Sequence, residues 1–178
     1  MDVNKTIETR RSIRKYQDKE ISMDLIKDIL NAARLAPSAY NAQPSRFIVI
    51  QDKKIKETLK ENNVFKQPFV YNAPVIIICL GDPEVYPKER LEPIYSNPKE
   101  IAGDIGAVRD VAISAQNLVL RATELGLGTC YIGLVNRDRI KEILGIPDNY
   151  VLPFVITVGY PDEDPDPMPR KDMKDIII

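Results

Sequence analysis

The hydrophobic positions of this chain recur with two periods, and each period predicts its own kind of element. Apolar residues at helical spacing within otherwise polar segments are typical of amphipathic helices. Such segments are Ser22–Ala36, Lys53–Glu61, Asp104–Leu125 and a short stretch that Asn136 would cap and that runs to Leu144. Ser22 is placed to cap the first helix, and Pro37 stops it. The apolar stripe of the third is too wide for a helix that rests on one surface, so we expect a central buried helix there.

Short apolar runs rich in β-branched residues predict the strands. They are Arg46–Gln51, Pro74–Leu80 and Val151–Gly159, and Thr129–Val135 fits either a strand or a tight crossing segment. The run Pro74–Leu80 lacks alternation, which favours a central strand covered on both faces. Pro153 lies near the start of the last run and suits an edge or strand-opening position. Together these elements indicate a mixed α/β domain, and the pattern alone leaves the direction of the strands open.

Two proline-rich segments interrupt this regular order. Residues Asp82–Lys99 are rich in proline and charge, which favours a surface excursion from one domain over a linker between two. The tail Tyr160–Ile178 begins acidic and proline-rich, carries the pair Arg170-Lys171, and ends in Ile176-Ile177-Ile178. That apolar end is typical of a segment buried against another surface, for which a partner protomer is the natural candidate. We expect a single domain over residues 1–178, which is long enough for one well-buried core.

Composition excludes several classes of function. Lysine and arginine total 25 against 26 acidic residues, so no overall field attracts nucleic acid or an anionic membrane. No apolar run reaches the length of about eighteen residues that a membrane span needs, and the N-terminus lacks a hydrophobic signal core. Cys79 and Cys130 stand far apart and indicate neither a disulfide framework nor a zinc site. A reduced, cytoplasmic protein fits these features best.

The chain contains no histidine, which narrows the chemistry further. Catalysis by a Ser-His-Asp or Cys-His arrangement is excluded, and the commonest nitrogen ligand for zinc is missing. We therefore expect an enzyme of this composition to depend on a bound cofactor for its chemistry.

Three arginines and a serine lie within five residues near the start of the chain, Arg10-Arg11-Ser12-Ile13-Arg14. A guanidinium donates fork-shaped hydrogen bonds that match a phosphate, and alternate residues of an extended segment point the same way. The cluster is therefore a candidate anchor for a phosphorylated cofactor. Taken alone, a short charged run is more simply explained as a solvated basic turn.

The order of motifs along nearly the whole chain resembles the nitroreductase superfamily of flavin mononucleotide (FMN) enzymes. The motifs are Arg10-Arg11-Ser12-Ile13-Arg14, then Pro37-Ser38-Ala39-Tyr40-Asn41-Ala42-Gln43-Pro44, Asn72-Ala73-Pro74, the run from Gly126 to Gly133, and Gly159-Tyr160-Pro161 followed by Pro169-Arg170-Lys171. The resemblance implies an α+β, three-layer fold with a mostly antiparallel sheet flanked by helices. It also implies a homodimer that exchanges terminal arms, residues 160–178 among them, with the flavin at the interface.

The resemblance implies three groups of cofactor-binding residues. The group that would hold the flavin phosphate is Arg10, Arg11, Ser12, Arg170 and Lys171. The group that would line the ring or ribityl chain from the opposite protomer is Pro37, Ser38, Ala39, Tyr40, Asn41 and Gln43. The group that would present its backbone to flavin N5 and O4 is Ile132, Gly133 and Leu134. A backbone N–H in this last group could polarise N5, although a strand glycine that marks a bulge is the alternative at Gly133.

Single residues carry further expectations from the same resemblance. Arg14 would reach the pyrimidine edge of the ring, where a fixed guanidinium stabilises the negative charge of reduced flavin. Gln67 could bond the uracil edge, and Lys66 is as good a match. The family often has an aromatic residue where this chain has Ser45, and Tyr40 could supply that aromatic wall instead. Cys130 is more simply a small core residue than a redox group.

These expectations define a function. We predict an FMN-dependent oxidoreductase that takes hydride from NADH or NADPH at flavin N5 and passes it, in ping-pong order, to a flat nitroaromatic or quinone. No protein residue need act as a general acid, and no metal is needed. Two alternatives stay open: a specialised chemistry of the superfamily, such as reductive dehalogenation, flavin breakdown or heterocycle dehydrogenation, and a flavin-binding module without turnover. A specialised member would need a lid, for which Asp82–Gly103 is the available segment.

Overall fold

A computed structural model describes residues 2–87 and 103–178 of the chain. Its elements are α1 (Val3–Thr9), α2 (Met23–Arg34), η1 (Ala39–Asn41), β1 (Ser45–Ile50), α3 (Lys53–Glu61), α4 (Phe69–Asn72), β2 (Val75–Gly81), η2 (Pro83–Val85), α7 (Asp104–Glu124), β3 (Gly128–Ile132), α8 (Arg137–Leu144), β4 (Val151–Gly159) and η3 (Met173–Asp175). Most of the segment Asp82–Gly103, which the sequence offers as a lid, lies outside the described residues.

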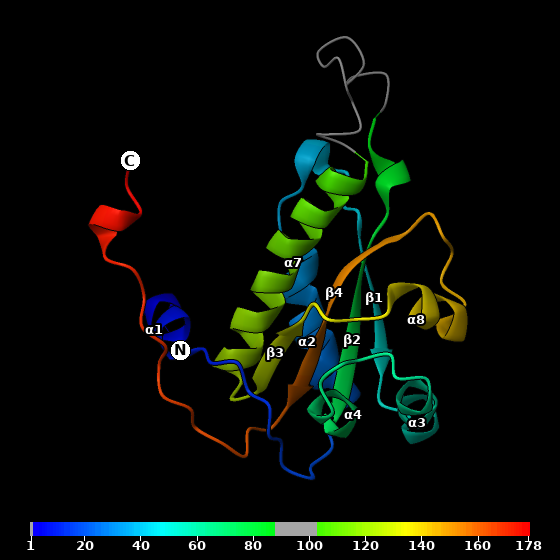
Figure 1. Cartoon of the computed structure of the whole chain (residues 1–178). Helices are drawn as coiled ribbons and strands as arrows, with labels where there is room; N and C mark the ends of the chain where they lie inside the picture. The colour runs from blue at the N-terminus through cyan, green and yellow to red at the C-terminus, as the bar shows by residue number, and fades with distance from the viewer. Residues whose placement is uncertain (1, 88–102) are drawn as a thin grey trace.

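A four-stranded sheet stands between two layers of helices (Figure 1). The strand order is β1-β2-β4-β3, and every neighbouring pair runs antiparallel. This confirms the α+β fold with an antiparallel sheet flanked by helices, and it settles the strand direction that the hydrophobic pattern left open.

The helix starts follow capping chemistry that is visible in the sequence. The Ser22 side chain caps α2 by accepting the N–H of Leu25, and the Asn136 side chain caps α8 by accepting that of Arg139. A capping oxygen satisfies one of the N–H groups that a helix start leaves without a partner. Both predicted caps are confirmed.

Two apolar clusters fill the space between the sheet and the helices. Helices α2 and α7 cover one face of the sheet, and α3, α4 and α8 cover the other. Because side chains alternate along a strand, Ile77 and Cys79 of β2 join the first cluster while Ile76 and Ile78 join the second. All of β2 is buried, which confirms the predicted central strand.

One expectation about position needs correction, and another is narrowed. Helix α7 is buried along one side only, since Ile105, Val108 and Ile113 are 59%, 39% and 40% exposed. Its wide apolar stripe therefore combines a face that packs in the core with a second face that stays exposed in the single chain. Of the two positions that suit Pro153, an edge or the opening of a strand, the second agrees with the structure: β4 is an interior strand, and Pro153 lies near its start, before pairing with β3 begins at Val155. At this place its missing N–H removes no bond to β3.

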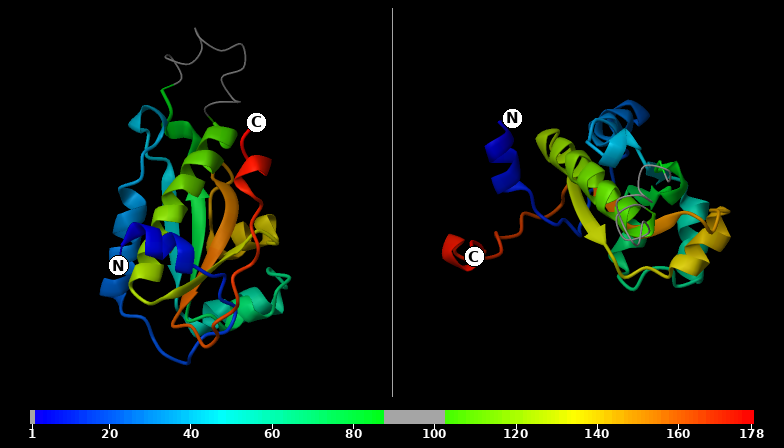
Figure 2. Two further views of the ribbon diagram at one scale, coloured as in Figure 1. Left: turned by 90° about the vertical axis from the view of Figure 1, so that its left-hand side faces the viewer. Right: turned by 90° about the horizontal axis from the view of Figure 1, so that it is seen from above.

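The N-terminal segment and the C-terminal tail run beside one another. Tyr16 and Pro161 form an antiparallel bridge, and the Asp162 N–H donates to the Lys15 carbonyl at 3.0 Å. The C-terminal part of the tail leaves the body on the same side as α1 and lies farther from the sheet than α1 does (Figure 2). Its last residues, Ile176–Ile178, are 58%, 69% and 122% exposed. That this tail packs on a second protomer stays a prediction, as does the single-domain assignment.

Candidate functional site

The arginine segment, Arg10–Arg14, lies in extended form along the start of β3. Ser12 and Thr129 form a parallel bridge, and the Ile13 N–H donates to the Thr129 carbonyl at 2.9 Å. Ile13 is buried, whereas Arg14 is exposed. Since neighbouring residues of an extended chain face opposite ways, the burial of Ile13 turns the residues before and after it toward solvent.

Two glycines make room for this segment at the paired ends of β3 and β4. Gly128 and Gly159 are register partners in the sheet. A methyl group on Gly128 would lie 2.7 Å from the Ile13 side chain, and one on Gly159 would overlap the ring of Tyr16. The Tyr16 hydroxyl donates to the Ile13 carbonyl at 2.6 Å and lies 2.7 Å from the Thr157 hydroxyl. Close packing and hydrogen bonds therefore fix the segment to the sheet.

The polar side chains of Arg10, Ser12 and Arg14 influence the thiol of Cys130. Burial raises the pKa of the Cys130 thiol, and the Arg14 charge, a hydrogen bond with Ser12 and the Arg10 charge act in the opposite direction. Cys130 itself is 5% exposed and packs in the core cluster below α8, which agrees with its interpretation as a small core residue. The arrangement offers two guanidinium groups and a hydroxyl, the donors that suit a phosphate.

Arg11 is placed differently from its neighbours. Its guanidinium donates to the carbonyl of Pro165 at 3.3 Å and to the carbonyls of Glu8 and Arg10 at 2.8 and 3.0 Å. The Glu163 carboxylate, two residues before Pro165, accepts backbone N–H groups of the same segment. These bonds tie the first part of the tail to the arginine segment, and they commit the Nε and Nη1 donors of Arg11 to the chain itself.

A second cluster forms where β3 ends. The strand stops at Ile132, three residues sooner than predicted, and the chain continues through the exposed residues Gly133 and Leu134. The Lys66 N–H donates to the Leu134 carbonyl at 3.4 Å, so the segment before α4 lies alongside. Gln67 follows in that segment. The structure therefore brings Gln67 next to the Ile132–Leu134 group, as the resemblance implies.

This second cluster has the properties of a binding surface. The Gln67 side-chain oxygen is buried and has no hydrogen-bond partner among the described residues. A methyl group added to Gly133 would meet nothing within 4 Å, so the backbone is open to close approach. A buried acceptor without a partner is costly unless a ligand or water supplies a donor, which makes Gln67 a candidate ligand contact.

The turn Pro37–Gln43 is strained and firmly held. Tyr40, Asn41 and Gln43 have φ angles of 55°, 54° and 51°, in the left-handed region that costs a non-glycine residue about 1 kcal/mol or more. The Ser38 hydroxyl accepts the Gln43 N–H at 2.8 Å and closes the turn. Backbone strain of this kind persists only where surrounding contacts determine the conformation, and it is frequent in binding segments.

A buried carboxylate on α7 supports this turn. Asp110 is 2% exposed, and its Oδ2 accepts the Ala39 N–H and the Tyr86 hydroxyl, each at 2.9 Å. The Arg109 guanidinium lies 3.0 Å from Oδ1. Burial, the hydrogen bond to Asp110 and the carboxylate charge raise the pKa of Tyr86. The turn is therefore held in one shape even though Tyr40 is 49% exposed.

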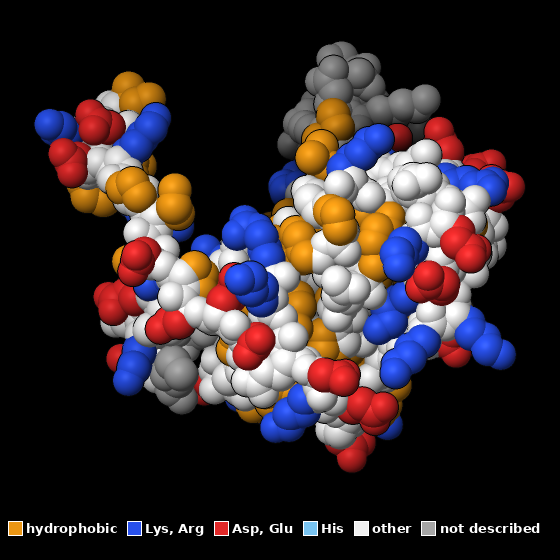
Figure 3. All heavy atoms as spheres, turned by 60° about the horizontal axis from the view of Figure 1, so that its bottom comes forward, with side chains coloured by type: hydrophobic (Ala, Val, Ile, Leu, Met, Phe, Trp, Pro, Cys, Tyr) orange, Lys and Arg blue, Asp and Glu red, His pale blue; other side chains and the backbone are white. Residues whose placement is uncertain are grey.

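The turn and the arginine segment do not meet in a single chain. The turn lies by the N-terminal end of α7, whereas the arginine segment passes its C-terminal end, near the start of β3 (Figure 1). The distal tail, residues 166–178, stands away from the body across an open gap with hydrophobic side chains exposed (Figure 3). Arg170 and Lys171 belong to this tail, and Arg170 donates to the carbonyls of Met168 and Pro169. The single chain does not bring this basic pair to Arg10.

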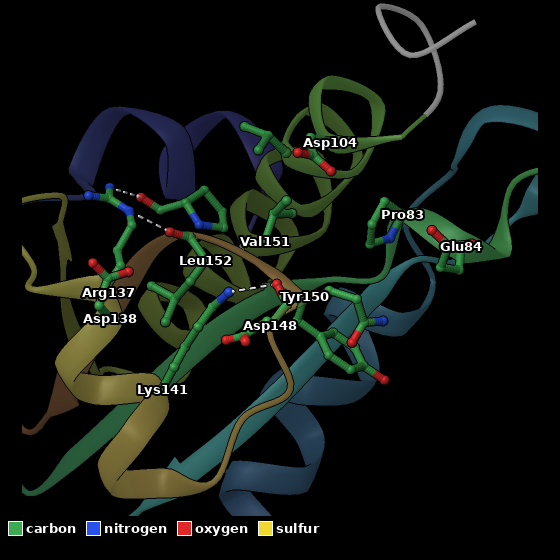
Figure 4. A pocket seen from close by; sticks show the side chains of 13 residues that line it. Pro83, Glu84, Asp104, Arg137, Asp138, Lys141, Asp148, Tyr150, Val151 and Leu152 are labelled. Carbon is green, nitrogen blue, oxygen red and sulfur yellow. Dashed lines mark hydrogen bonds between the residues drawn. The ribbon is translucent and has the colours of Figure 1, made fainter.

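A pocket of about 740 Å³ lies between α8, the start of β4 and the start of α7 (Figure 4). Arg137 on α8 lines it and donates from Nε to the Leu152 carbonyl at 2.7 Å.

Sequence reasoning missed both Arg137 and Asp110. A carboxylate inside the apolar stripe of α7 was a usable signal for Asp110, whereas nothing in the local pattern distinguishes Arg137 from other surface arginines.

Comparison with known proteins decides the family. The family model described as "Nitroreductase family" matches residues 7–63 and 60–160. The chain belongs to the nitroreductase family. A relative from Archaeoglobus fulgidus, named NADH dehydrogenase/NAD(P)H nitroreductase, is 36% identical over 168 residues, which cover 91% of this chain and 87% of the relative. The family resemblance is thereby confirmed, and this nitroreductase is an oxidoreductase by its membership.

Solved structures support the same placement. A nitroreductase-like protein from Streptococcus mutans superimposes with a TM-score of 0.90 at 26% identity, covering 98% of this chain and 96% of that one. A nitroreductase from Exiguobacterium sibiricum, solved in complex with FMN, gives a TM-score of 0.87 at 25% identity, covering 100% and 97% of the two chains. The nitroreductase fold of this chain is thus established.

Residues 2–87 and 103–178 show neither a membrane-spanning helix nor a cluster of metal ligands. None of the helices there has the length and apolar character needed to cross a membrane. In the same part of this nitroreductase, no group of three or more histidine, cysteine, aspartate or glutamate side chains is arranged to hold a metal ion.

Proposed function

We propose that this nitroreductase is an FMN-dependent NAD(P)H oxidoreductase that reduces a flat acceptor such as a nitroaromatic or a quinone. The observation that carries the proposal is that the segment bearing Arg10, Ser12 and Arg14 is fixed to β3, through the Ser12–Thr129 bridge and the bond from the Ile13 N–H to the Thr129 carbonyl. Solved relatives that hold FMN, and relatives named for NAD(P)H, support the same conclusion.

The residues present fit FMN at both ends of the cofactor. Arg10 and Ser12 would hold the phosphate, because a guanidinium and a hydroxyl are matched donors for its oxygens. Gln67 would accept a hydrogen bond from an N–H of the ring, which would satisfy its buried, unpaired oxygen. Gly133 leaves its backbone open to a flat ring at close range.

Bound FMN would supply the redox chemistry, by accepting hydride from NADH or NADPH and then delivering it to the acceptor in ping-pong order. Arg14 would place a fixed positive charge at the pyrimidine edge, which favours arrival of a negative hydride. The chain has no histidine, so water rather than a side chain of that kind would supply protons to the acceptor. Arg11 would have its Nη2 donors to offer a phosphate while its Nε and Nη1 hold three carbonyls.

A second copy of the chain would complete the site. The turn Pro37–Gln43 would come from that copy and cover the cofactor, with Ser38, Tyr40 and Asn41 offering polar and aromatic contacts. The exposed apolar face of α7 and the exposed end Ile176–Ile178 support such a homodimer, since both would be buried by it. Arg170 and Lys171 would reach a phosphate site by the same exchange of tails.

The test is a reconstitution followed by turnover. The purified protein is titrated with FMN, gel-filtered, and supplied with NADH or NADPH and either a quinone or a nitroaromatic. We expect a yellow dimer that consumes nicotinamide only when an acceptor is present. A protein that retains no flavin would refute the whole proposal, whereas a yellow protein that neither nicotinamide reduces would be a flavin-binding module without turnover.

A further inference from the structure

The backbones of β3 and β4 separate beyond one residue pair. Ile132 of β3 and Val155 of β4 are the last register partners at this end of the sheet. After Ile132 the chain leads to α8, and the residues before Val155 form the start of β4, which no longer pairs with β3. Carbonyl groups that face such a gap lose their ladder donors and must find others. The donor here is a side chain.

The guanidinium of Arg137 fills this gap. Its Nε donates to the Leu152 carbonyl at 2.7 Å, and its Nη2 donates to the Pro153 carbonyl at 2.9 Å (Figure 4). The same Nη2 lies 3.3 Å from the Gly133 carbonyl. One planar, rigid fork thus bridges the two diverging backbones and continues the ladder past its end. A lysine at this position would supply charge without the fork.

These bonds fix the peptide between Gly133 and Leu134. The Gly133 carbonyl also accepts the Val135 N–H at 3.1 Å, so two donors hold its direction. The peptide is trans, and in a trans peptide the N–H points away from the preceding carbonyl. The Leu134 N–H is therefore directed away from Arg137, and it has no recorded hydrogen-bond partner among the described residues. The result is a fixed, free donor beside an open glycine.

We propose that Arg137 is a positioning residue that presents the free Leu134 N–H to the hydride-accepting part of the cofactor ring. It acts through the backbone, without touching the reacting atoms. A donor held in place before the reaction stabilises developing charge without the cost of reorganisation. This inference rests on the proposed function, because it needs a bound flavin to act upon.

The test compares three single substitutions. Arg137→Lys keeps the charge and loses the fork, and Arg137→Gln loses both. The control is Lys141→Gln, since Lys141 lines the same pocket and donates to the Asp148 carbonyl at 3.0 Å, with no recorded contact to Gly133 among the described residues. Anaerobic stopped-flow mixing with reduced nicotinamide gives the rate of flavin reduction, and fluorescence quenching gives the Kd for FMN.

We expect both Arg137 variants to reduce flavin roughly tenfold more slowly, with KM for nicotinamide and Kd for FMN within about twofold of wild type. The amide resonances of Gly133 and Leu134 should shift in both variants of the FMN-free protein and stay in place in Lys141→Gln. Arg137 is exposed, so at least one of its variants should fold, and either one alone is informative.

Three outcomes would overturn the proposal. Arg137→Lys could match wild type while Arg137→Gln is slow, which would assign the effect to charge alone. Both variants could match wild type, or Lys141→Gln could be equally slow. If wild type itself binds no flavin, the proposed function fails instead, and the amide shifts of the FMN-free protein then decide separately whether Arg137 positions this peptide.

Discussion

The arginine segment and the turn Pro37–Gln43 are two halves of one candidate site, and they are held in contrasting ways. The segment is held by close packing, because Ile13 and Tyr16 fill the space left by two paired glycines. The turn is held by a hydrogen bond, because the buried carboxylate of Asp110 accepts the Ala39 N–H next to the strained residues. Both halves are rigid before any ligand arrives, yet they lie at opposite ends of α7. The site that we propose therefore needs a second chain to bring its halves together.

The largest expected effect comes from the segment itself. Replacing Arg10 and Ser12 together by Ala removes two donors, and a hydrogen bond to a charged group contributes about 1.5–3 kcal/mol. FMN binding should therefore weaken by roughly a hundredfold or more. Fluorescence titration measures it. Arg11→Ala is the matched control, since the Nε and Nη1 donors of Arg11 are committed to carbonyls. An equal loss of affinity in that variant would show that the two arginines share one role.

The turn should be sensitive to one carboxylate. Asp110→Ala leaves the Ala39 N–H and the Tyr86 hydroxyl without their acceptor, which should lower the free energy of unfolding by about 2 kcal/mol. FMN affinity should fall as well, because the turn loses its fixed shape. Urea titration and flavin binding measure the two effects. Tyr86→Phe removes one of the same bonds and spares the turn, so it should lower stability but leave flavin affinity near wild type.

A pair of glycine substitutions separates the packing of the segment from the approach of a ligand. Gly128→Ala would push a methyl group into Ile13, which should destabilise the fold by about 1–3 kcal/mol. Gly133→Ala meets nothing within 4 Å, so stability should stay unchanged while FMN binding weakens. Thermal unfolding and flavin titration distinguish the two. A stable Gly128→Ala protein would contradict the proposed seat of the segment.

The smallest expected effect concerns Cys130. Burial raises the pKa of its thiol, and the nearby Arg14 and Arg10 charges only partly oppose that. A raised pKa keeps the thiol protonated at neutral pH, so the reactive thiolate forms only at higher pH. The folded protein should therefore resist iodoacetamide near neutral pH. Rapid labelling of Cys130 there would mean that the cations outweigh burial and that the segment is more open than described.

Local chemistry could be predicted from the sequence more reliably than long-range pairing. The bounds of α3 match Lys53–Glu61, and the cap of α2 is at Ser22, because helices depend on neighbouring residues. The placement of β4 between β2 and β3 could not be predicted, since it depends on contacts far apart in the sequence. β3 also ends sooner than its apolar run, at Ile132, where its pairing with β4 stops.

In the candidate site, too, residues within local motifs could be predicted, whereas residues that act through long-range contacts could not. The motifs named Arg10, Ser12 and Gln67, and the structure supplies the contacts that surround them. Asp110 and Arg137 act on backbone groups that are remote in the sequence, as Asp110 does on Ala39. Such roles arise only from folding. The pattern of residue types along the sequence does not reveal these roles, although a carboxylate in an apolar stripe marks Asp110 as unusual.

The central claim, that one chain supplies the phosphate-binding segment and another the turn, is tested most directly by mixing two defective variants. Co-expression of Arg10→Ala/Ser12→Ala with Asp110→Ala gives dimers of which half carry both kinds of chain. Each mixed dimer would hold one site with both halves intact, so about a quarter of all sites should bind FMN with wild-type affinity. Affinities no better than those of the separate variants would contradict the account.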